Sequence, residues 1–251
     1  LKNRGLATER EIDEFLHPDY SRDIHDPYLF SQMPRVVEAL YEAHAKKEKI
    51  AIFGDYDADG VCGSAILHAC FTLLNFSFVT YLPDREKEGY GLNAGALKSL
   101  ADQGVKLIIT VDCGISNAAD IELANSLGLR VIITDHHHVP EKIPPALAII
   151  HPGWDKNYPF KNLAGGGVAF KVAQALIRDP RSKIPTAQGQ ALEKWLLDLA
   201  SISTVADMVP MLGENRTIVK YGLIVLAKTK NLGLAKLMEA AAINQAKADA
   251  T

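Results

Sequence analysis

Three short apolar runs of the sequence each end in acidic or histidine side chains. Gly-Asp-Tyr-Asp-Ala-Asp-Gly occupies residues 54–60, Asp-Cys-Gly begins at Asp112, and Asp-His-His-His begins at Asp135. Carboxylates so close together repel one another, so folding tolerates them when cations neutralise them or when several are protonated. Carboxylates mixed with imidazoles suit Mn²⁺, Mg²⁺ or Zn²⁺, and the excess of oxygen favours Mn²⁺ or Mg²⁺. These motifs therefore predict a divalent-metal site, whereas the plainer interpretation is that Asp and Gly only terminate strands as turn residues.

A fourth carboxylate, Asp207, stands in the otherwise apolar stretch 204–210. An ionised carboxylate among apolar residues needs a partner, and a metal ion would satisfy it. The alternative is that Asp207 caps the start of a helix or occupies a turn before Pro210.

Two other motifs share part of this pattern. Residues 55–60 match the first half of a calcium-binding EF-hand loop, but Ile66 stands where the bidentate Glu is required, and a strand precedes the loop. We therefore reject the EF hand. Asp57-Ala-Asp59-Gly after a strand is also similar to the aspartyl-nucleophile phosphatases. That interpretation stays a minor alternative, because the later strand ends in paired histidines.

The elements that must position these groups follow from short apolar runs that alternate with longer helical stretches. Nearly continuous β-branched runs between helices are typical of a parallel sheet covered on both faces. Right-handed crossovers bring the carboxyl ends of such strands to one edge, where open α/β sheets bind ligands. We predict an α/β fold with a parallel sheet of about five strands and helices on both faces. The expected strands are Ile50–Phe53, Phe78–Leu82, Val105–Val111, Leu129–Thr134 and Ala146–Ile150, with helices near 60–75, 93–103, 116–127 and 164–178.

Helical segments are expected on both sides of this sheet. Thr8-Glu-Arg-Glu resembles a capping box, and residues 33–47 show apolar residues at helical spacing. We predict a helical N-terminal segment over 1–48, a catalytic domain over 49–212, and a helical extension over 213–251. The helices expected after residue 187 are 190–200, 216–227 and 232–242. The chain opens on Leu1 and ends without a stop signal, so we expect a fragment.

Composition excludes several classes of protein. The 251 residues are 48% hydrophobic, with 27 Lys and Arg against 30 Asp and Glu, which is too apolar for a disordered chain. No stretch approaches the roughly 20 apolar residues of a membrane span, and no signal peptide is visible. The three cysteines are an odd number and none has metal-finger spacing, which predicts reduced core thiols in a cytoplasmic protein. The slightly acidic balance argues against attraction of the whole surface to DNA or anionic lipid and leaves a local basic groove as an alternative.

Taken together, the motifs resemble the DHH phosphoesterase superfamily, which is named after the triplet seen here as Asp135-His136-His137. They lie in the family's order across most of residues 50–210. Within the superfamily, the chain is most similar to the catalytic core of RecJ-type single-strand-specific exonucleases. The strings that carry this resemblance are 54–60, Val111–Gly114, Thr134–His137, Thr204–Asp207, Asp84–Leu92 and Ala164–Lys171.

The resemblance implies a two-metal site. It implies that His137 faces the substrate phosphate and that Asp135 orients the histidine pair. The family's pyrophosphatases carry a metal-binding His four residues before the first ligand Asp, where this chain has Phe53. We therefore expect one metal to be held more weakly, or to be completed by water or by Asp55, which we include in the catalytic group. The implied ligands of the two Mn²⁺ or Mg²⁺ ions are Asp57, Asp59, Asp112, His136 and Asp207, with Asp112 bridging.

Two further segments are candidates for substrate binding. Arg85 and Tyr90 lie in one loop and could contact phosphate and stack on a base, although a solvated loop explains them equally well. Glycines 165–167 open a helix and could present N–H groups to a phosphate, although close helix–sheet packing also explains them. His138 is expected to be a surface or supporting residue. The glycine candidates are Gly165, Gly166 and Gly167.

The family's reaction is the 5′→3′ release of mononucleotides from single-stranded DNA. The residues themselves support metal-dependent phosphoester hydrolysis, which leaves pyrophosphate, oligoribonucleotides and cyclic dinucleotides as alternative substrates. A non-catalytic, metal-containing module that binds nucleic acid is a third hypothesis. The residues identify no protein partner, whether a single-strand-binding protein or a helicase, and indicate no membrane. Without the family's smaller C-terminal domain, we expect a fragment that binds metal yet cuts poorly.

Overall fold

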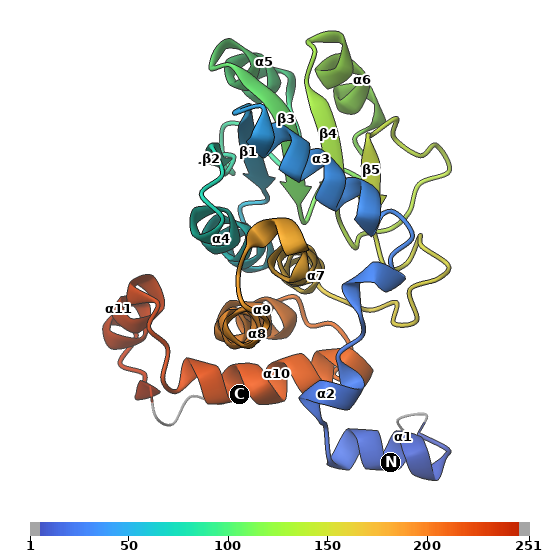
Figure 1. Cartoon of the computed structure of the whole chain (residues 1–251), viewed down its shortest axis with the longest axis vertical. Coiled ribbons are helices and arrows are strands. Elements are labelled where there is room, and N and C mark those ends of the chain that lie inside the picture. The colour runs from blue at the N-terminus through green and yellow to red at the C-terminus, as the bar shows by residue number, and fades with distance from the viewer. Residues whose placement is uncertain (1–5, 246–251) are drawn as a thin grey trace.

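The computed structural model, which describes residues 6–245, contains a five-stranded parallel sheet in the upper half of the view in Figure 1, with α8 to α11 (residues 186–240) and the N-terminal helices α1 and α2 (residues 9–23) below it. The strand order is β2-β1-β3-β4-β5 (Figure 1). Each predicted strand is present, with its ends shifted by no more than about two residues, so the predicted α/β class is confirmed. The strands are β1 (Lys49–Gly54), β2 (Phe78–Tyr81), β3 (Val105–Val111), β4 (Arg130–Thr134) and β5 (Ala148–Ile150).

Helices cover both faces of the sheet, which explains why the strands are apolar throughout. In β1, Ile50 and Ile52 face one core cluster, whereas Ala51 and Phe53 face the other. The first cluster is shared with α3 (Met33–Ala45), α4 (Ala58–Leu73) and α7 (Gly165–Arg178), and the second with α5 (Ala94–Asp102) and α6 (Ala118–Ser126).

Further helices at the two ends of the chain flank this sandwich. The predicted capping box is confirmed: Thr8 accepts from the Glu11 amide, and the Glu11 carboxylate accepts from the Thr8 amide. Residues 1–5 of the predicted N-terminal segment lie outside the described part. The flanking elements are α1 (Glu9–Leu16), α2 (Tyr20–Asp23), η2 (Pro27–Leu29), η3 (Pro180–Ser182), α8 (Thr186–Trp195), α9 (Leu197–Ala206), α10 (Gly213–Leu226) and α11 (Leu232–Ala240).

The predicted continuous helix over 190–200 is wrong, because α8 ends and α9 begins on either side of Leu196. The amide of Leu196 bonds to the carbonyl of Glu193, three residues back, which tightens the last turn of α8. Helix α8 is largely exposed, whereas α9 packs closely against α4, α7 and α10. Helix α9 ends at Ala206, and Asp207 is its C-cap. Asp207 therefore lies in a turn before Pro210 and does not cap the start of a helix.

One buried ion pair connects segments that the predicted boundaries at 48 and 212 would separate. Lys171 of α7 contacts Glu214 of α10 with both side chains fully buried, and its ammonium also donates to the carbonyl of His25. The Glu214 carboxylate accepts from the His25 amide at 3.0 Å and from the Tyr158 hydroxyl at 2.6 Å. The boundaries themselves stay predictions.

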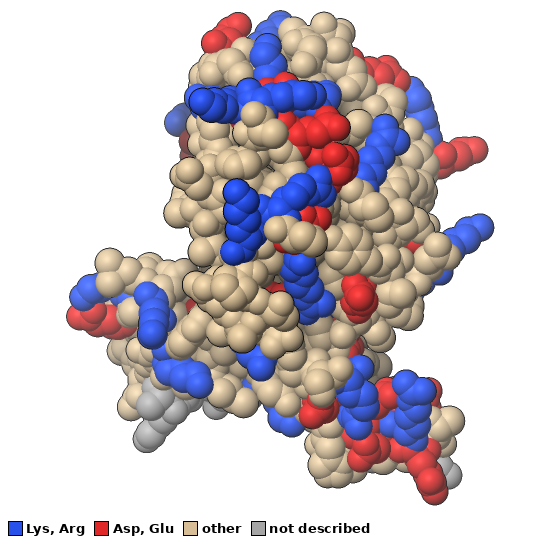
Figure 2. Space-filling model, in the orientation of Figure 1, with Lys and Arg blue, Asp and Glu red and all other residues tan. Residues whose placement is uncertain are grey.

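Charged side chains of both signs are interspersed on the face shown in Figure 2. This distribution agrees with the nearly balanced composition, and the view shows no continuous basic band. Within residues 6–245, no helix combines the length and the apolar character needed to cross a membrane.

Candidate metal centre

Three carboxylates follow the C-terminal ends of β1, β3 and β4 and lie at one edge of the sheet. They belong to Asp55, Asp112 and Asp135. The backbone ladder continues past the strands: Asp55 donates its N–H to the carbonyl of Val111, and Asp112 donates to that of Thr134, at 3.1 and 3.0 Å. Asp112 has φ +62°, a left-handed conformation that Asp tolerates better than most residues. The turn directs the chain out of β3 while the side chain stays 1% exposed.

His136 lies among three carboxylates that come from distant parts of the chain. Its Nε2 is 3.1 Å from Asp112 Oδ1, 3.5 Å from Asp59 Oδ2 and 3.6 Å from Asp207 Oδ2. The structure therefore brings together all five predicted ligands, together with Asp55 and His137. Their potential ligand atoms lie within 4.8 Å of one another in three groups, which are Asp112/His136/His137, Asp59/His136/Asp207 and Asp55/Asp57/Asp112.

The N-terminus of α4 positions the first two carboxylates. Asp57 is its N-cap, and one oxygen accepts the amides of Asp59 and Gly60, both at 2.9 Å. This hydrogen bonding satisfies two of the otherwise unpaired N–H groups of the helix. It also fixes the carboxylate of Asp57, which is itself exposed, beside the loop that carries Asp55.

The Asp59 carboxylate is held from the opposite side by α7 and α9. Its two oxygens accept the amides of Gly165 and Gly166, each at 2.7 Å, and the Ser203 hydroxyl donates to Oδ1 at 2.6 Å. The positive end of α7 therefore already has a negatively charged partner within the chain. The assignment of Gly165, Gly166 and Gly167 to substrate phosphate stays a prediction.

The chemistry of this cluster fits divalent cations. Asp55 Oδ1, Asp112 Oδ1 and His136 Nε2 are buried and have no hydrogen-bond partner among residues 6–245, which is costly unless another ligand satisfies them. Burial, followed by the nearby Asp59 carboxylate, raises the pKa of Asp112 to about 10, and burial also raises the pKa of Asp55 and of Asp207. Without cations, these groups cannot all be ionised together. The oxygen-rich donor set matches the preference of Mn²⁺ and Mg²⁺.

Asp135 organises the loop that carries His136 and His137, which we call the histidine loop. Fully buried, it accepts the amides of His136 and His137 on Oδ1 and the amide of Ile115 on Oδ2, at 2.7, 3.1 and 2.9 Å. The same Oδ1 lies 2.8 Å from His137 Nδ1. Burial acts to raise the pKa of Asp135, but these hydrogen bonds lower it below its usual value. The hydrogen bond to Asp135 raises the pKa of His137.

Tyr90 contacts His137 from the solvent side. Its hydroxyl lies 3.2 Å from His137 Nδ1 and 3.3 Å from the carbonyl oxygen of Asp112, and the two rings meet edge to face. The Tyr90 side chain is nevertheless 46% exposed, so it borders the site and also supports the histidine.

The remaining predicted residues lie at the periphery. Arg85 is exposed, and its guanidinium lies 5.2 Å from the ring of Tyr56, which belongs to the 54–60 loop. His138 is exposed. Phe53 is buried on the sheet face opposite α4 and stacks on Tyr81 with ring centroids 5.1 Å apart, so it is part of the core.

Two residues that support the site, Ser203 and His151, are not among the predicted ones. Ser203 is fully buried and lies one helical turn before Asp207, a spacing that places both on one face of α9. His151 follows β5 and contacts the histidine loop through its ring. The i, i+4 spacing was a usable signal for Ser203, and the position after a strand was one for His151.

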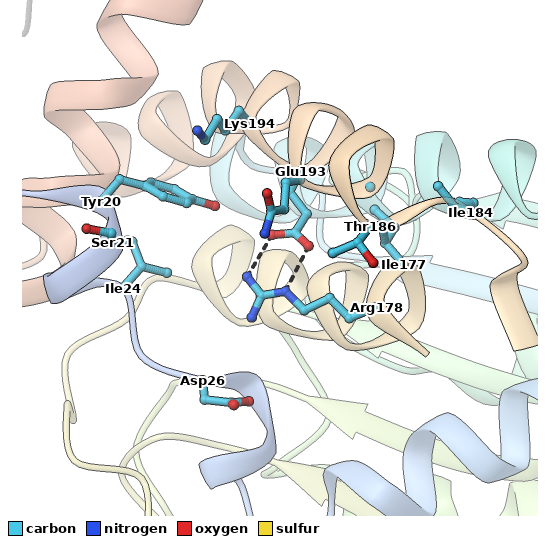
Figure 3. Close-up of a pocket in the computed structure, with 12 residues that line it drawn as sticks. Tyr20, Ser21, Ile24, Asp26, Ile177, Arg178, Ile184, Thr186, Glu193 and Lys194 are labelled. Atoms are coloured by element: carbon cyan, nitrogen blue, oxygen red, sulfur yellow. Dashed lines mark hydrogen bonds and ion pairs between the residues drawn. The ribbon is translucent and has the colours of Figure 1, made fainter. Parts of the chain in front are cut away.

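A cavity of about 560 Å³ lies elsewhere, between α2, the end of α7 and α8 (Figure 3). Arg178 and Glu193, which both line it, form a bidentate ion pair with N–O distances of 2.8 and 2.7 Å. None of the predicted site residues lines this cavity, so it is separate from the carboxylate cluster.

Comparison with known proteins identifies the family. Residues 49–204 match the DHH family, N-terminal domain. The chain belongs to the DHH family. The match covers β1 to β5 and α7 and ends within α9 at Thr204, three residues before Asp207.

Single-stranded-DNA-specific exonucleases named RecJ are similar to this DHH-family chain over nearly its whole length. The Bacillus subtilis protein is 42% identical over 95% of the chain, and the Escherichia coli protein is 38% identical over 95%. The chain spans 29% and 42% of the lengths of those two relatives.

Two solved structures share its fold. A RecJ exonuclease bound to manganese has a TM-score of 0.75 and 34% identity, covering 85% of this chain and 52% of that one. Thermus thermophilus RecJ in complex with Mn²⁺ has a TM-score of 0.76 and 29% identity, covering 97% and 33%.

Proposed function

We propose that this chain is the metal-binding catalytic part of an exonuclease that removes mononucleotides from the 5′ end of single-stranded DNA in recombination and repair. The observation that carries the proposal is the convergence of Asp59, Asp112 and Asp207 on His136, at the strand edge where this fold binds ligands. The similarity to exonucleases named RecJ supports the substrate class. A reaction on DNA agrees with a cytoplasmic location.

Two Mn²⁺ or Mg²⁺ ions, when bound, would lower the pKa of an attacking water and neutralise charge on the scissile phosphate. The cluster contains the donors for such a pair, and metal-bound relatives support the choice of ions. Asp112 and His136 each belong to two of the three ligand groups. Of the two, only the carboxylate has two oxygens that could each bind an ion, which supports Asp112 as the shared ligand. The residues that would hold the ions are Asp57, Asp59, Asp112, His136 and Asp207, with Asp55 available to complete one site.

The other side chains would act on substrate and on one another. We assign His137 the role of donor to the substrate phosphate, because its ring is 41% exposed while Asp135 holds Nδ1. The hydrogen bond from Nδ1 to Asp135 leaves Nε2 to face the substrate and favours the charged imidazolium that stabilises a phosphate anion. Arg85, at the periphery of the site, would contact the DNA strand farther from the metal ions. Tyr90 would both border the terminal nucleotide and hold His137 in place. Gly165 and Gly166 would affect the reaction indirectly, because their amides hold the Asp59 carboxylate in place.

The test is degradation of labelled DNA by the full-length protein with Mn²⁺ or Mg²⁺. The proposal expects mononucleotides released from the 5′ end of single strands, slower attack on duplex, and loss of activity in Asp112→Ala. Faster hydrolysis of pyrophosphate, oligoribonucleotides or cyclic dinucleotides would favour a small-substrate enzyme. Binding of Mn²⁺ and of DNA without hydrolysis of any of these would favour a non-catalytic module.

A further inference from the structure

A buried histidine outside the carboxylate cluster holds the backbone of the histidine loop. His151 follows β5 and is 1% exposed, and its Nε2 lies 2.8 Å from the carbonyl oxygen of His137. Among the described residues it belongs to none of the three ligand groups. It is therefore outside the proposed metal ligands, yet its ring contacts the residue that we assign to the phosphate.

The surroundings of His151 fix which ring nitrogen carries the hydrogen. Nδ1 lies 3.1 Å from the backbone nitrogens of both Gly153 and Trp154, and these N–H groups can only donate. Nδ1 is therefore an acceptor, so the hydrogen of the neutral ring is on Nε2. That donor is directed at the carbonyl oxygen of His137.

Gly153 allows the turn to close on the ring. A Cβ atom at this position would lie 3.2 Å from His151 Cε1, closer than most real Cβ contacts. The turn after β5 thus holds the Nδ1 edge of the imidazole, and the Nε2 edge faces the carbonyl oxygen of His137.

His137 is consequently attached on two sides. Its amide and its Nδ1 bond to Asp135 Oδ1 at 3.1 and 2.8 Å, and its carbonyl bonds to His151. We propose that His151 is a positioning residue, which fixes the His137 peptide and thereby aims the His137 ring at the substrate phosphate. This inference rests on the proposed function for the role of His137, whereas the positioning itself is a property of the chain alone.

Two substitutions separate the two hydrogen-bonding ends of His151. Asn can accept the amides of Gly153 and Trp154 near the Nδ1 position but is too short to reach the carbonyl of His137. Gln can extend an N–H donor toward the Nε2 position. We expect His151→Asn to keep the melting temperature near that of the wild type and to lower kcat about 10- to 100-fold with little change in KM. The reason is that a displaced His137 ring would mainly lose its stabilisation of the transition state. His151→Gln should recover most of kcat.

A second readout is independent of catalysis. Long-range ¹H–¹⁵N spectra of the histidine rings in the metal-free protein should show shifted His137 resonances in His151→Asn and near-wild-type ones in His151→Gln. The inference is overturned if His137 resonances do not move in the Asn variant, if its kcat is unchanged, or if both variants lose activity in proportion to stability. If the wild-type protein fails to degrade DNA while the spectra change as expected, the proposed function fails and the positioning role stands.

Discussion

Gly165 lies directly against the side chain of Asp112. A Cβ atom on Gly165 would fall 2.6 Å from both Cβ and Oδ1 of Asp112, a separation that real Cβ atoms essentially never show. The first residue of α7 therefore has to be glycine for the carboxylate at the end of β3 to occupy its observed position. Close packing of the helix against the sheet thus bears directly on the proposed metal ligands.

Replacement of Gly165 by alanine should therefore displace Asp112 and weaken the binding of Mn²⁺. Because the new Cβ would collide with the Cβ of the buried Asp112 residue, an atom whose position the backbone fixes, we expect a loss of about 1–3 kcal/mol in unfolding free energy, as is typical of overpacked sites. Gly167→Ala is the matched control, since its new Cβ would meet only the Leu163 side chain, at 3.3 Å. Calorimetric titration with Mn²⁺ compares the two variants, and equal affinities would contradict the assignment of Asp112.

Asp112→Asn should stabilise the metal-free protein while abolishing its response to metal. The substitution removes a buried carboxylate whose ionisation is opposed by burial and by Asp59. Conversely, a metal that binds only the native wild type raises its stability by about 2.7 kcal/mol at a hundred times its Kd. Thermal unfolding with and without Mn²⁺ measures both effects. A wild-type melting temperature that does not respond to Mn²⁺ would refute the metal centre.

Ser203→Ala tests whether α9 orients the Asp59 carboxylate. The buried hydroxyl donates to Asp59 Oδ1 at 2.6 Å, and loss of a partner that orients a ligand commonly lowers metal affinity about 10- to 100-fold. Ser201→Ala is the matched control, because that hydroxyl is equally buried but bonds to the carbonyl of Asp198 within the helix. Equal Mn²⁺ affinities in the two variants would show that Ser203 is only a packing residue.

The sequence predicted the parts of the site that follow from strand ends. Asp55, Asp112 and Asp135 each come directly after an apolar run, and parallel strands bring such positions to one edge. Ser203 and His151 escaped prediction because their partners lie 144 and 14 residues away. The helical spacing of Ser203 from Asp207 and the position of His151 after a strand do not identify those partners by themselves. The break at Leu196 escaped as well, since no Gly or Pro marks it and the apolar residues 195–197 run across it without interruption.

The Lys171–Glu214 pair should make three parts of the chain unfold together, namely the N-terminal segment, the predicted domain over 49–212 and α10. Lys171→Met leaves the Glu214 carboxylate buried without its cation, which typically costs about 3–5 kcal/mol. Adding Glu214→Gln removes that charge. The Gln oxygen can still accept from the His25 amide, and its NH₂ group can donate to the Tyr158 hydroxyl oxygen, so the double variant should recover much of the loss. Denaturant unfolding followed by two probes measures this. Two separate transitions in the wild type would instead support independent units divided near residues 48 and 212.

The three cysteines should be inert in the native protein at neutral pH. Burial raises the pKa of Cys62 to about 12 and also raises the pKa of Cys70 and Cys113 above the usual thiol value. At pH 8, only about one Cys62 in 10⁴ would carry the reactive thiolate, and that fraction would grow about tenfold per pH unit, since deprotonation is favoured as pH rises. Iodoacetamide labelling followed by mass spectrometry should therefore modify the three residues only after denaturation, where an ordinary thiol pKa returns. Rapid native labelling of Cys62 at pH 8, with the unfolded chain as the reference rate, would mean that α4 opens locally beside the carboxylate cluster.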